Sequence, residues 1–82
     1  MTGYRIDWID STSSNSTWTL LSELDGELRP IEISTYGVIV KKTKEFIIVA
    51  QNYGIDPDQV CNLMTIPRGC IKKITRLEGK KI

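Results

Sequence analysis

A chain of 82 residues, of which 40% are hydrophobic and 26% charged, has the composition of a soluble globular domain and the length of only one. Its formal net charge is +1, and no apolar run approaches the roughly 20 residues of a membrane-spanning helix, which excludes such a helix. The N-terminus has no apolar segment of the signal-peptide type, so we expect a cytoplasmic protein without a membrane partner.

The charges are distributed unevenly along the chain. Residues 1–40 hold two basic and six acidic side chains, a formal charge of −4, whereas residues 41–82 hold nine basic and four acidic ones, a charge of +5. Such asymmetry is typical of a protein with an anionic partner at one face. The alternative is that strand surfaces and turns carry charge for solubility alone.

The first predicted strand covers residues 4–9. Tyr4, Ile6 and Trp8 alternate with the polar Arg5 and Asp7, which is the period of a strand with one buried face. Residues 10–16 then form a polar loop rich in serine.

A short helical segment is predicted over residues 18–24. Ser16 or Thr17 can cap its start, and Asp25-Gly26 ends it. Its leucines fall on one side, and we expect them to cover one open end of the fold; they are Leu20, Leu21 and Leu24.

Four further strands are predicted between residues 31 and 77. They cover residues 31–40, 46–51 and 60–66, and a last strand with an irregular start carries core contacts at Ile71, Ile74 and Leu77. Gly37 lies inside the first of them, where glycine indicates a bulge or a sharp bend.

The connections between these strands contain turn-forming residues. Residues 41–45 are a basic turn, residues 52–58 a loop, and residues 67–69 a corner with one turn of 3₁₀ helix. Residues 78–82 are expected to be a frayed tail.

This order of elements resembles the Sm-like and SH3-like small barrels. Residues 66–74, Ile-Pro-Arg-Gly-Cys-Ile-Lys-Lys-Ile, resemble the second Sm motif, in which alternating aliphatic residues follow an Arg-Gly pair. The chain is also similar to short, uncharacterised proteins of bacteriophages and prophages that combine an N-terminal tryptophan segment with such a hairpin. In Sm proteins the loop between the second and third strands supplies an Asp and an Asn that bind RNA bases, whereas this chain has Lys-Lys-Thr-Lys-Glu there.

The resemblance implies an all-β fold with one short N-terminal helical segment, closed into a five-stranded barrel. We expect one domain over residues 1–82: residues 1–30 hold the first strand, the loop and the helical segment, residues 31–77 form the body, and residues 78–82 the tail. If a bacteriophage encodes the protein, its location is the host cytoplasm.

The residue types argue against catalysis. The chain has no histidine, which excludes the common dyads and triads that use it as a general base. Two pairs of carboxylates lie in or beside loops, where Asp usually bonds its own backbone: Asp7 with Asp10, and Asp56 with Asp58. We therefore expect a protein that is not an enzyme and needs no cofactor.

Two cysteines, Cys61 and Cys70, are too few for a four-ligand zinc site in a chain without histidine. Without a signal peptide they are expected to be reduced and buried, although a disulfide is possible if their strands are neighbours.

Basic side chains form the candidate ligand site. If the turn at 41–45 and the corner at 67–69 lie at the same end of the fold, they bring together Lys41, Lys42, Lys44 and Arg68, with Lys72 and Lys73 nearby. Such a cluster suits phosphate groups, and Tyr36 or Tyr53 can stack on a base. The alternative is that these lysines are solvated and prevent aggregation at sheet edges.

The two tryptophans also have two interpretations. Trp8 and Trp18 are expected to fill the core, as large aromatic residues mostly do in a small domain. If Trp18 is instead exposed beside Leu20, Leu21 and Leu24, these four residues form a protein interface.

Three binding functions fit these observations. The first is a homo-oligomeric protein-interaction module that pairs through its apolar strands or through residues 18–24. The second is sequestration of a small anionic nucleotide, such as a cyclic nucleotide of host immune signalling, in basic pockets between subunits. The third is binding of the RNA or DNA backbone, which the Sm resemblance implies.

Overall fold

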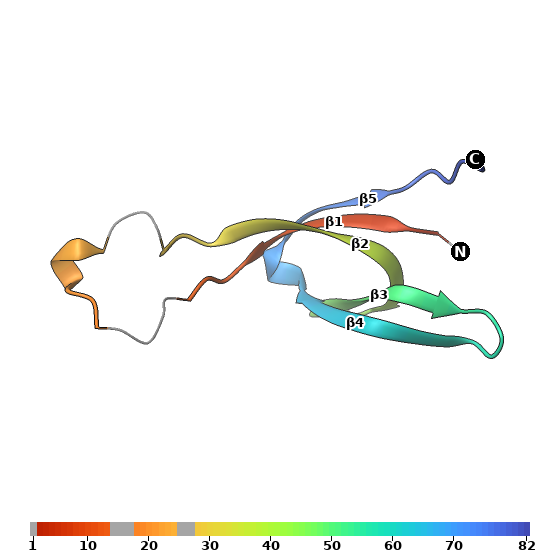
Figure 1. Cartoon of the computed structure of the whole chain (residues 1–82), viewed down its shortest axis with the longest axis horizontal. Helices are drawn as coiled ribbons and strands as arrows, with labels where there is room; N and C mark the ends of the chain where they lie inside the picture. Colours follow the sequence, from red (N-terminus) through yellow and green to blue (C-terminus); the bar gives the residue numbers. More distant parts are fainter. Residues whose placement is uncertain (1, 14–17, 25–27) are drawn as a thin grey trace.

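The computed structural model describes residues 2–13, 18–24 and 28–82, and in these residues five antiparallel strands form one sheet (Figure 1). The strand order is β4-β3-β2-β1-β5, with β1 (Tyr4–Asp10), β2 (Ile31–Lys42), β3 (Phe46–Gly54), β4 (Gln59–Pro67) and β5 (Ile71–Arg76). Two single turns of 3₁₀ helix, η1 (Leu21–Glu23) and η3 (Arg68–Cys70), accompany them. The prediction of an all-β fold is confirmed.

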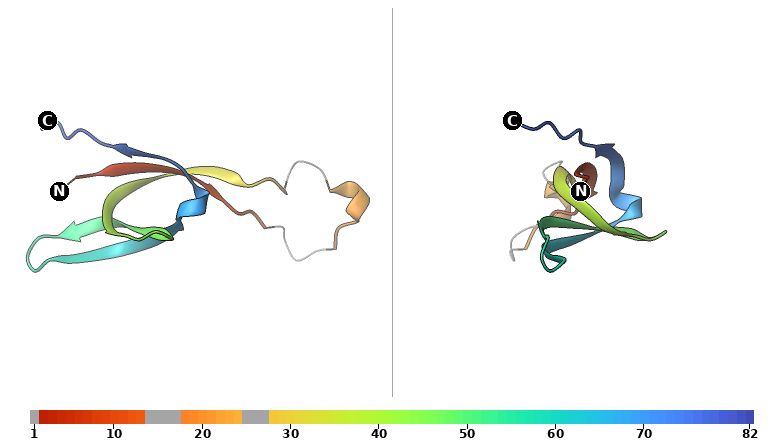
Figure 2. Two further views of the ribbon diagram at one scale, coloured as in Figure 1. Left: turned by 180° about the vertical axis from the view of Figure 1, so that it is seen from behind. Right: turned by 90° about the vertical axis from the view of Figure 1, so that its right-hand side faces the viewer.

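The long strand β2 divides the sheet into two halves. Its residues 31–37 pair with β1, from Asp10↔Ile31 to Tyr4↔Gly37, and its residues 38–42 pair with β3. Figures 1 and 2 show that β2 curls between these two regions, so that the β5-β1 half and the β3-β4 half lie over one another. The core fills the space between the halves.

Gly37 is the residue at which β2 passes from one half to the other. A Cβ atom at this position would lie 2.5 Å from the carbonyl oxygen of Ala50 and 2.7 Å from Cγ1 of Val49. Only glycine allows β2 to approach β3 this closely, because both distances are far below van der Waals contact. The predicted bend is thus found at Gly37, and a separate bulge follows between Ile39 and Lys41.

The core is small and is built from both halves. Its buried side chains come from β1, β3 and β4, and they are Ile6, Trp8, Ile47, Val49 and Ile66. The indole Nε1 of Trp8 donates to Oγ1 of the buried Thr35 at 2.9 Å. Because an unpartnered buried donor costs about 1–3 kcal/mol, this hydrogen bond allows Trp8 to be buried. The expectation that Trp8 fills the core is confirmed.

The sheet is open, so the closed barrel expected from the resemblance is not found. Strands β4 and β5 form the two edges, and no ladder joins them in the described residues. The turn η3 carries the chain from one edge to the other, where β5 pairs with β1 from Tyr4↔Arg76 to Trp8↔Ile71. The register of this ladder shifts at the start of β5, which confirms the predicted irregularity.

The helix predicted over residues 18–24 is wrong. Only the single 3₁₀ turn η1 is present there, and no side chain caps it. Trp18, which we expected in the core, is fully exposed, and residues 19–24 are exposed too, so the segment does not cover an end of the fold. The predicted helix boundaries at Ser16, Thr17 and Asp25-Gly26 lie outside the described residues.

The loop predicted at residues 52–58 is shorter than expected. Asn52, Tyr53 and Gly54 continue β3 and pair with Cys61, Val60 and Gln59, respectively. These turn-forming residues remain in the strand because β4 provides hydrogen-bonding partners for their backbone. Pairing with a neighbouring strand overrides their low intrinsic strand propensity.

Apolar residues near the C-terminal end are less buried than predicted. Cys61 is exposed on β4 and Cys70 is partly buried, and both thiols are free. Ile71 packs against the core, whereas Ile74 and Leu77 are exposed. Ile74 lies opposite the buried Ile6 but belongs to an edge strand, and Leu77 follows the end of β5. No helix in the described ranges has the length and apolar character that crossing a membrane requires.

Candidate functional site

The connection between β1 and β2 forms an arm that extends away from the sheet (Figure 1). It runs from residue 11 to residue 30, and η1 lies in its far part. Thr12 Oγ1 donates to the carbonyl oxygen of Arg29 at 3.0 Å, which joins the two sides of the arm just beyond the sheet. Connections longer than about 12–15 residues are uncommon in compact domains, and binding loops are prominent among them.

The arm gives the molecule an elongated shape. Its principal extents are 55 × 30 × 24 Å, and its radius of gyration is 16.9 Å. A compact domain of this length is expected to have a radius of gyration of about 12 Å. A large part of the chain therefore lies away from the core.

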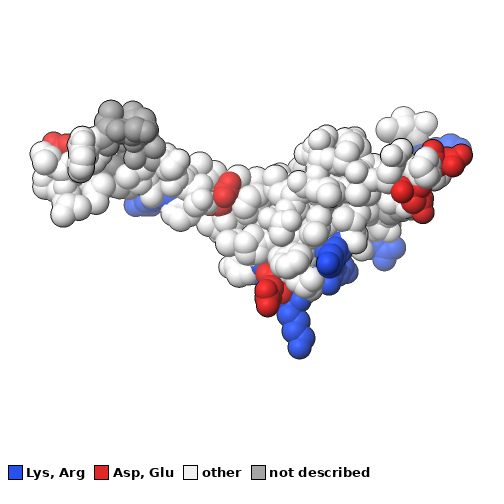
Figure 3. Space-filling view, turned by 90° about the horizontal axis from the view of Figure 1, so that it is seen from below, with Lys and Arg blue, Asp and Glu red and all other residues white. Residues whose placement is uncertain are grey.

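Large apolar side chains lie at the far part of the arm, and all of residues 18–24 are exposed. Relative exposure is 102% for Trp18, 66% for Leu20 and 85% for Leu21, and Leu24 is also exposed. We call Trp18, Leu20, Leu21 and Leu24 the apolar arm cluster. Figure 3 shows that uncharged side chains prevail at this end of the molecule.

The local backbone explains why these leucines do not form one helical face. In η1 the amide of Glu23 donates to the carbonyl of Leu20 at 2.9 Å, and that of Leu24 to the carbonyl of Leu21 at 3.3 Å. A single turn has too few hydrogen bonds to offset the unfavourable free energy of helix nucleation. Leu20 and Leu24 have extended backbone on either side of this turn, so the three leucines do not lie on a common helix.

The basic turn and the corner lie together, as the candidate ligand site requires. Arg68 Nε donates to the carbonyl oxygen of Thr43 at 3.1 Å, and the Arg68 amide donates to the carbonyl of Glu45 at 2.8 Å. Lys41 and Lys44 are exposed on this turn. Part of the hydrogen-bonding capacity of Arg68 is thus used to hold the corner against the turn.

Other members of the predicted basic site have partners elsewhere. Lys42 Nζ lies 6.0 Å from the ring centroid of Tyr4, which is within the range of a cation–π contact. Lys72 Nζ forms an ion pair with Glu32 Oε2 at 3.1 Å. Lys73 lies opposite Asp7 in the ladder between β5 and β1. The predicted cluster is therefore divided among three places.

The two tyrosines predicted to stack on a base lie apart from the basic turn. Tyr36 is exposed on β2 opposite Arg5. Tyr53 follows Phe46 by seven residues along β3, which separates it from the turn by roughly 23 Å of extended strand. A hydrogen bond with Asp58 raises the pKa of Tyr53, and burial acts in the same direction.

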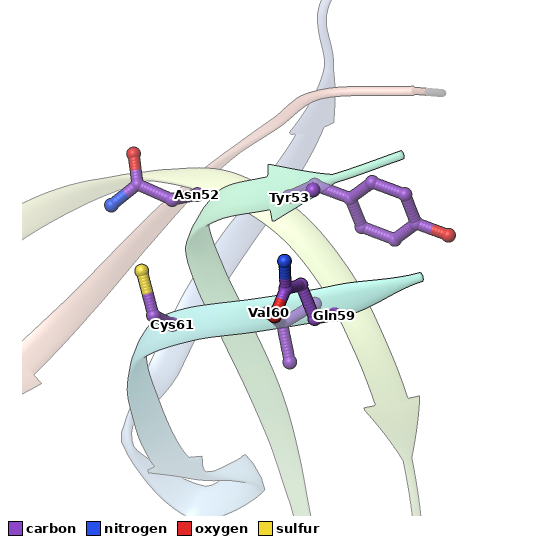
Figure 4. A pocket seen from close by; sticks show the side chains of 6 residues that line it. Asn52, Tyr53, Gln59, Val60 and Cys61 are labelled. Atoms are coloured by element: carbon purple, nitrogen blue, oxygen red, sulfur yellow. The ribbon is translucent and has the colours of Figure 1, made fainter. Parts of the chain in front are cut away.

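Tyr53 instead borders two shallow hollows at the β3–β4 hairpin. One has a volume of about 400 Å³ and is lined by residues 52–54 and 59–61 (Figure 4). Asn52 and Cys61 point to the same side of the hairpin there, whereas Val60 points to the other. The second, of about 340 Å³, shares Tyr53 and Gln59 with the first. The first hollow has no charged lining residue and so does not suit an anion.

The carboxylates show no arrangement for metal binding. In the described parts of the chain no group of three or more His, Cys, Asp or Glu residues lies close enough to hold a metal ion. Asp7 is engaged by Ser34 and Arg5, and these hydrogen bonds lower its pKa.

Comparison of the chain with protein-family models, with curated proteins and with solved structures finds no match.

One surface was not singled out by sequence reasoning, namely the free edge of β4. The strand holds no charged residue between Gln59 and Pro67, and Ile66 is its only buried member. The absence of charge was visible in the sequence, but the position of β4 at an edge was not.

Proposed function

We propose that this protein is a non-enzymatic binding module that acts through protein–protein contacts, with the apolar arm cluster as its binding element. The observation that supports this most is the full exposure of Trp18 beside Leu20 and Leu21, on a segment that takes no part in the core. Large apolar side chains gathered on one exposed segment mark an interaction site in a protein of otherwise ordinary composition.

Burial of the cluster provides the driving force for binding. Each large side chain gives about 1.5–3 kcal/mol when it is removed from water, so Trp18, Leu20 and Leu21 together give roughly 5–9 kcal/mol before the cost of association is subtracted. Tryptophan is enriched among the residues that dominate interface energies. Since Trp18 and Leu21 are almost completely exposed, burying them requires a partner protein with an apolar groove.

The arm also defines how binding responds to salt. Glu23 is the only charged residue among residues 18–24, so contacts made by this segment depend little on ionic strength. Contacts made by the basic turn with phosphates would weaken steeply as salt rises.

The proposal is tested by placing a photo-crosslinking amino acid at Trp18 in cells that express the protein. We expect a defined crosslinked protein band that disappears when Leu20 and Leu21 are both replaced by Ser. Tyr36, which is exposed on the sheet, is the matched control position and should give no such band.

A synthetic peptide of residues 11–30 should compete for the same partner, and a peptide with Trp18→Ser should not. The proposal is contradicted if positions 18 and 36 give the same bands, or if the complex resists the Leu20/Leu21 double variant and dissociates with salt.

A further inference from the structure

The two edges of the sheet differ in length and in charge. Strand β4 has nine residues, none of them charged, whereas β5 has six and carries Lys72, Lys73 and Arg76. Proteins usually protect a free edge with charged side chains, proline or a short strand, because its unpaired backbone groups accept a strand from another chain. Strand β5 has this protection, whereas β4 has only Pro67 at its last position and an irregularity at Asn62, and residues 63–66 between them are unprotected.

Several of the exposed residues of β4 are large and apolar. Leu63 is 55% exposed and Met64 40% exposed, and Val60 is exposed as well. In the described part of the chain, β3 is the only strand that pairs with β4. Figure 1 shows β4 along the lower margin of the sheet, and in the view from below basic side chains lie toward the margins of this face (Figure 3).

We infer that β4 is the interface of a two-fold symmetric dimer, in which it pairs antiparallel with β4 of a second copy. This inference goes beyond the binding function of the arm, which lies at another place on the molecule.

Charge identifies the occupant of this edge as a second β4. A strand that pairs with β4 places its side chains beside the apolar Leu63 and Met64, where charged side chains would lose part of their hydration without gaining a counter-charge. Of the two edges in this chain, only β4 is uncharged, whereas β5 would bring three basic side chains to a strand that has no carboxylate.

Symmetry makes the assembly finite. Pairing of β4 with itself is isologous, so it closes with two copies and leaves no further uncharged edge. The outer edges of the resulting ten-stranded sheet are the two β5 strands, which repel further copies through their basic side chains.

The backbone limits the pairing of two β4 strands to residues 63–67. Asn62 has a φ of 57°, which lies outside the strand region, and it is skipped in the β3–β4 ladder between Asn52↔Cys61 and Ala50↔Leu63. Regular pairing resumes at Leu63 and continues to Pro67, so this part of the edge is available to a second strand.

The first test is the mass of the protein by light scattering across a dilution series. We expect wild type at twice the monomer mass and Leu63→Lys at the monomer mass, since a dimer would bring two new charges together. Leu21→Lys is the matched control: it makes the same exchange at an exposed position on the arm and should remain dimeric. Circular dichroism verifies that both variants are folded.

Disulfide trapping tests the same interface without a charge change. In a background without native cysteines, at least one of Leu63→Cys, Met64→Cys and Thr65→Cys should give a linked dimer on mild oxidation, and Lys73→Cys on β5 should not. The inference is overturned by a monomeric wild type, by a Leu63→Lys dimer, or by species larger than a dimer, which indicate head-to-tail pairing of β4 with β5. Failure of trapping at all three β4 positions also overturns it, and none of these results affects the arm proposal.

Discussion

At the scale of single residues, Asp7 joins two strands on the outer face of the sheet. Its Oδ1 accepts hydrogen bonds from Ser34 Oγ on β2 and from Arg5 Nε at 3.0 Å on its own strand. The Ser34 bond has the largest effect in lowering the pKa of Asp7, and the Arg5 bond and the charge of Lys73 act in the same direction. Because this pKa is lower in the folded than in the unfolded state, the unfolded chain binds the proton more tightly. The stabilisation is present above about pH 3.9 and is lost as the pH falls through the folded pKa.

Replacement of Asp7 by Asn is therefore expected to reduce the acid sensitivity of folding. Wild type should lose more free energy of unfolding than Asp7→Asn between about pH 5 and pH 3, because only wild type must protonate this carboxylate. Urea unfolding at a series of pH values measures the difference. Ser34→Ala, which removes the largest cause of the shift, should give an intermediate curve. Parallel curves for all three proteins would exclude the role assigned to Asp7.

At the scale of the element, the curl of β2 depends on the absence of a side chain at Gly37. Gly37→Ala places a methyl group 2.5 Å from the Ala50 carbonyl oxygen, which is backbone and cannot rotate away. We expect a loss of about 1–3 kcal/mol in the free energy of unfolding, the usual cost of overpacking. Gly69→Ala is the matched control, since no atom lies within 4 Å of its added Cβ, and it should change stability by less than about 0.5 kcal/mol. Equal effects in urea unfolding would contradict this explanation of the bend.

Elements with strict alternation were predicted closely from the sequence. The first strand was expected at residues 4–9 and is found at Tyr4–Asp10, because Ile6 and Trp8 both face the core. The strand at residues 52–54 was missed because Asn52 and Gly54 are turn formers whose pairing with β4 is a tertiary contact. The sequence pattern of residues 52–54 does not show that β4 continues beside them as a pairing partner.

The sequence predicted the contacts of the candidate ligand site only where two connections between strands lie at the same end of the fold. The approach of Arg68 to the 41–45 turn was expected, but the ion pair of Lys72 with Glu32 joins residues far apart in sequence. The residues of the apolar arm cluster were predicted to lie against the core. An apolar pattern shows which side chains would gain free energy from burial, but it does not show which of them are buried in the fold. All four are exposed, and none belongs to the core cluster found in the described residues.

At the scale of the whole molecule, the surfaces with distinct chemistry lie on separate parts of the chain. The apolar arm cluster lies within the β1–β2 connection, the basic turn and corner join β2 to β3 and β4 to β5, and the uncharged edge is β4 itself. The core cluster uses residues of β1, β3 and β4 and none of the described residues of the arm. Because additivity holds for sites without shared partners, each surface can be altered without the others.

Removal of the arm tests this separation directly. A variant in which residues 14–27 are replaced by a short Gly-Ser linker should retain its free energy of unfolding or gain up to about 0.6 kcal/mol, because the shorter loop costs less entropy to close and residues 18–24 make no core contact. Its radius of gyration in small-angle X-ray scattering should fall from the 16.9 Å of the full chain toward the value of about 12 Å expected for a compact domain, with both proteins measured as the Leu63→Lys monomer. A loss of more than about 2 kcal/mol would mean that the arm packs on the sheet in solution, since deletions of that cost remove buried apolar contacts. An unchanged radius would show that the full-length arm is already folded back, and its apolar cluster would then be covered by the protein itself.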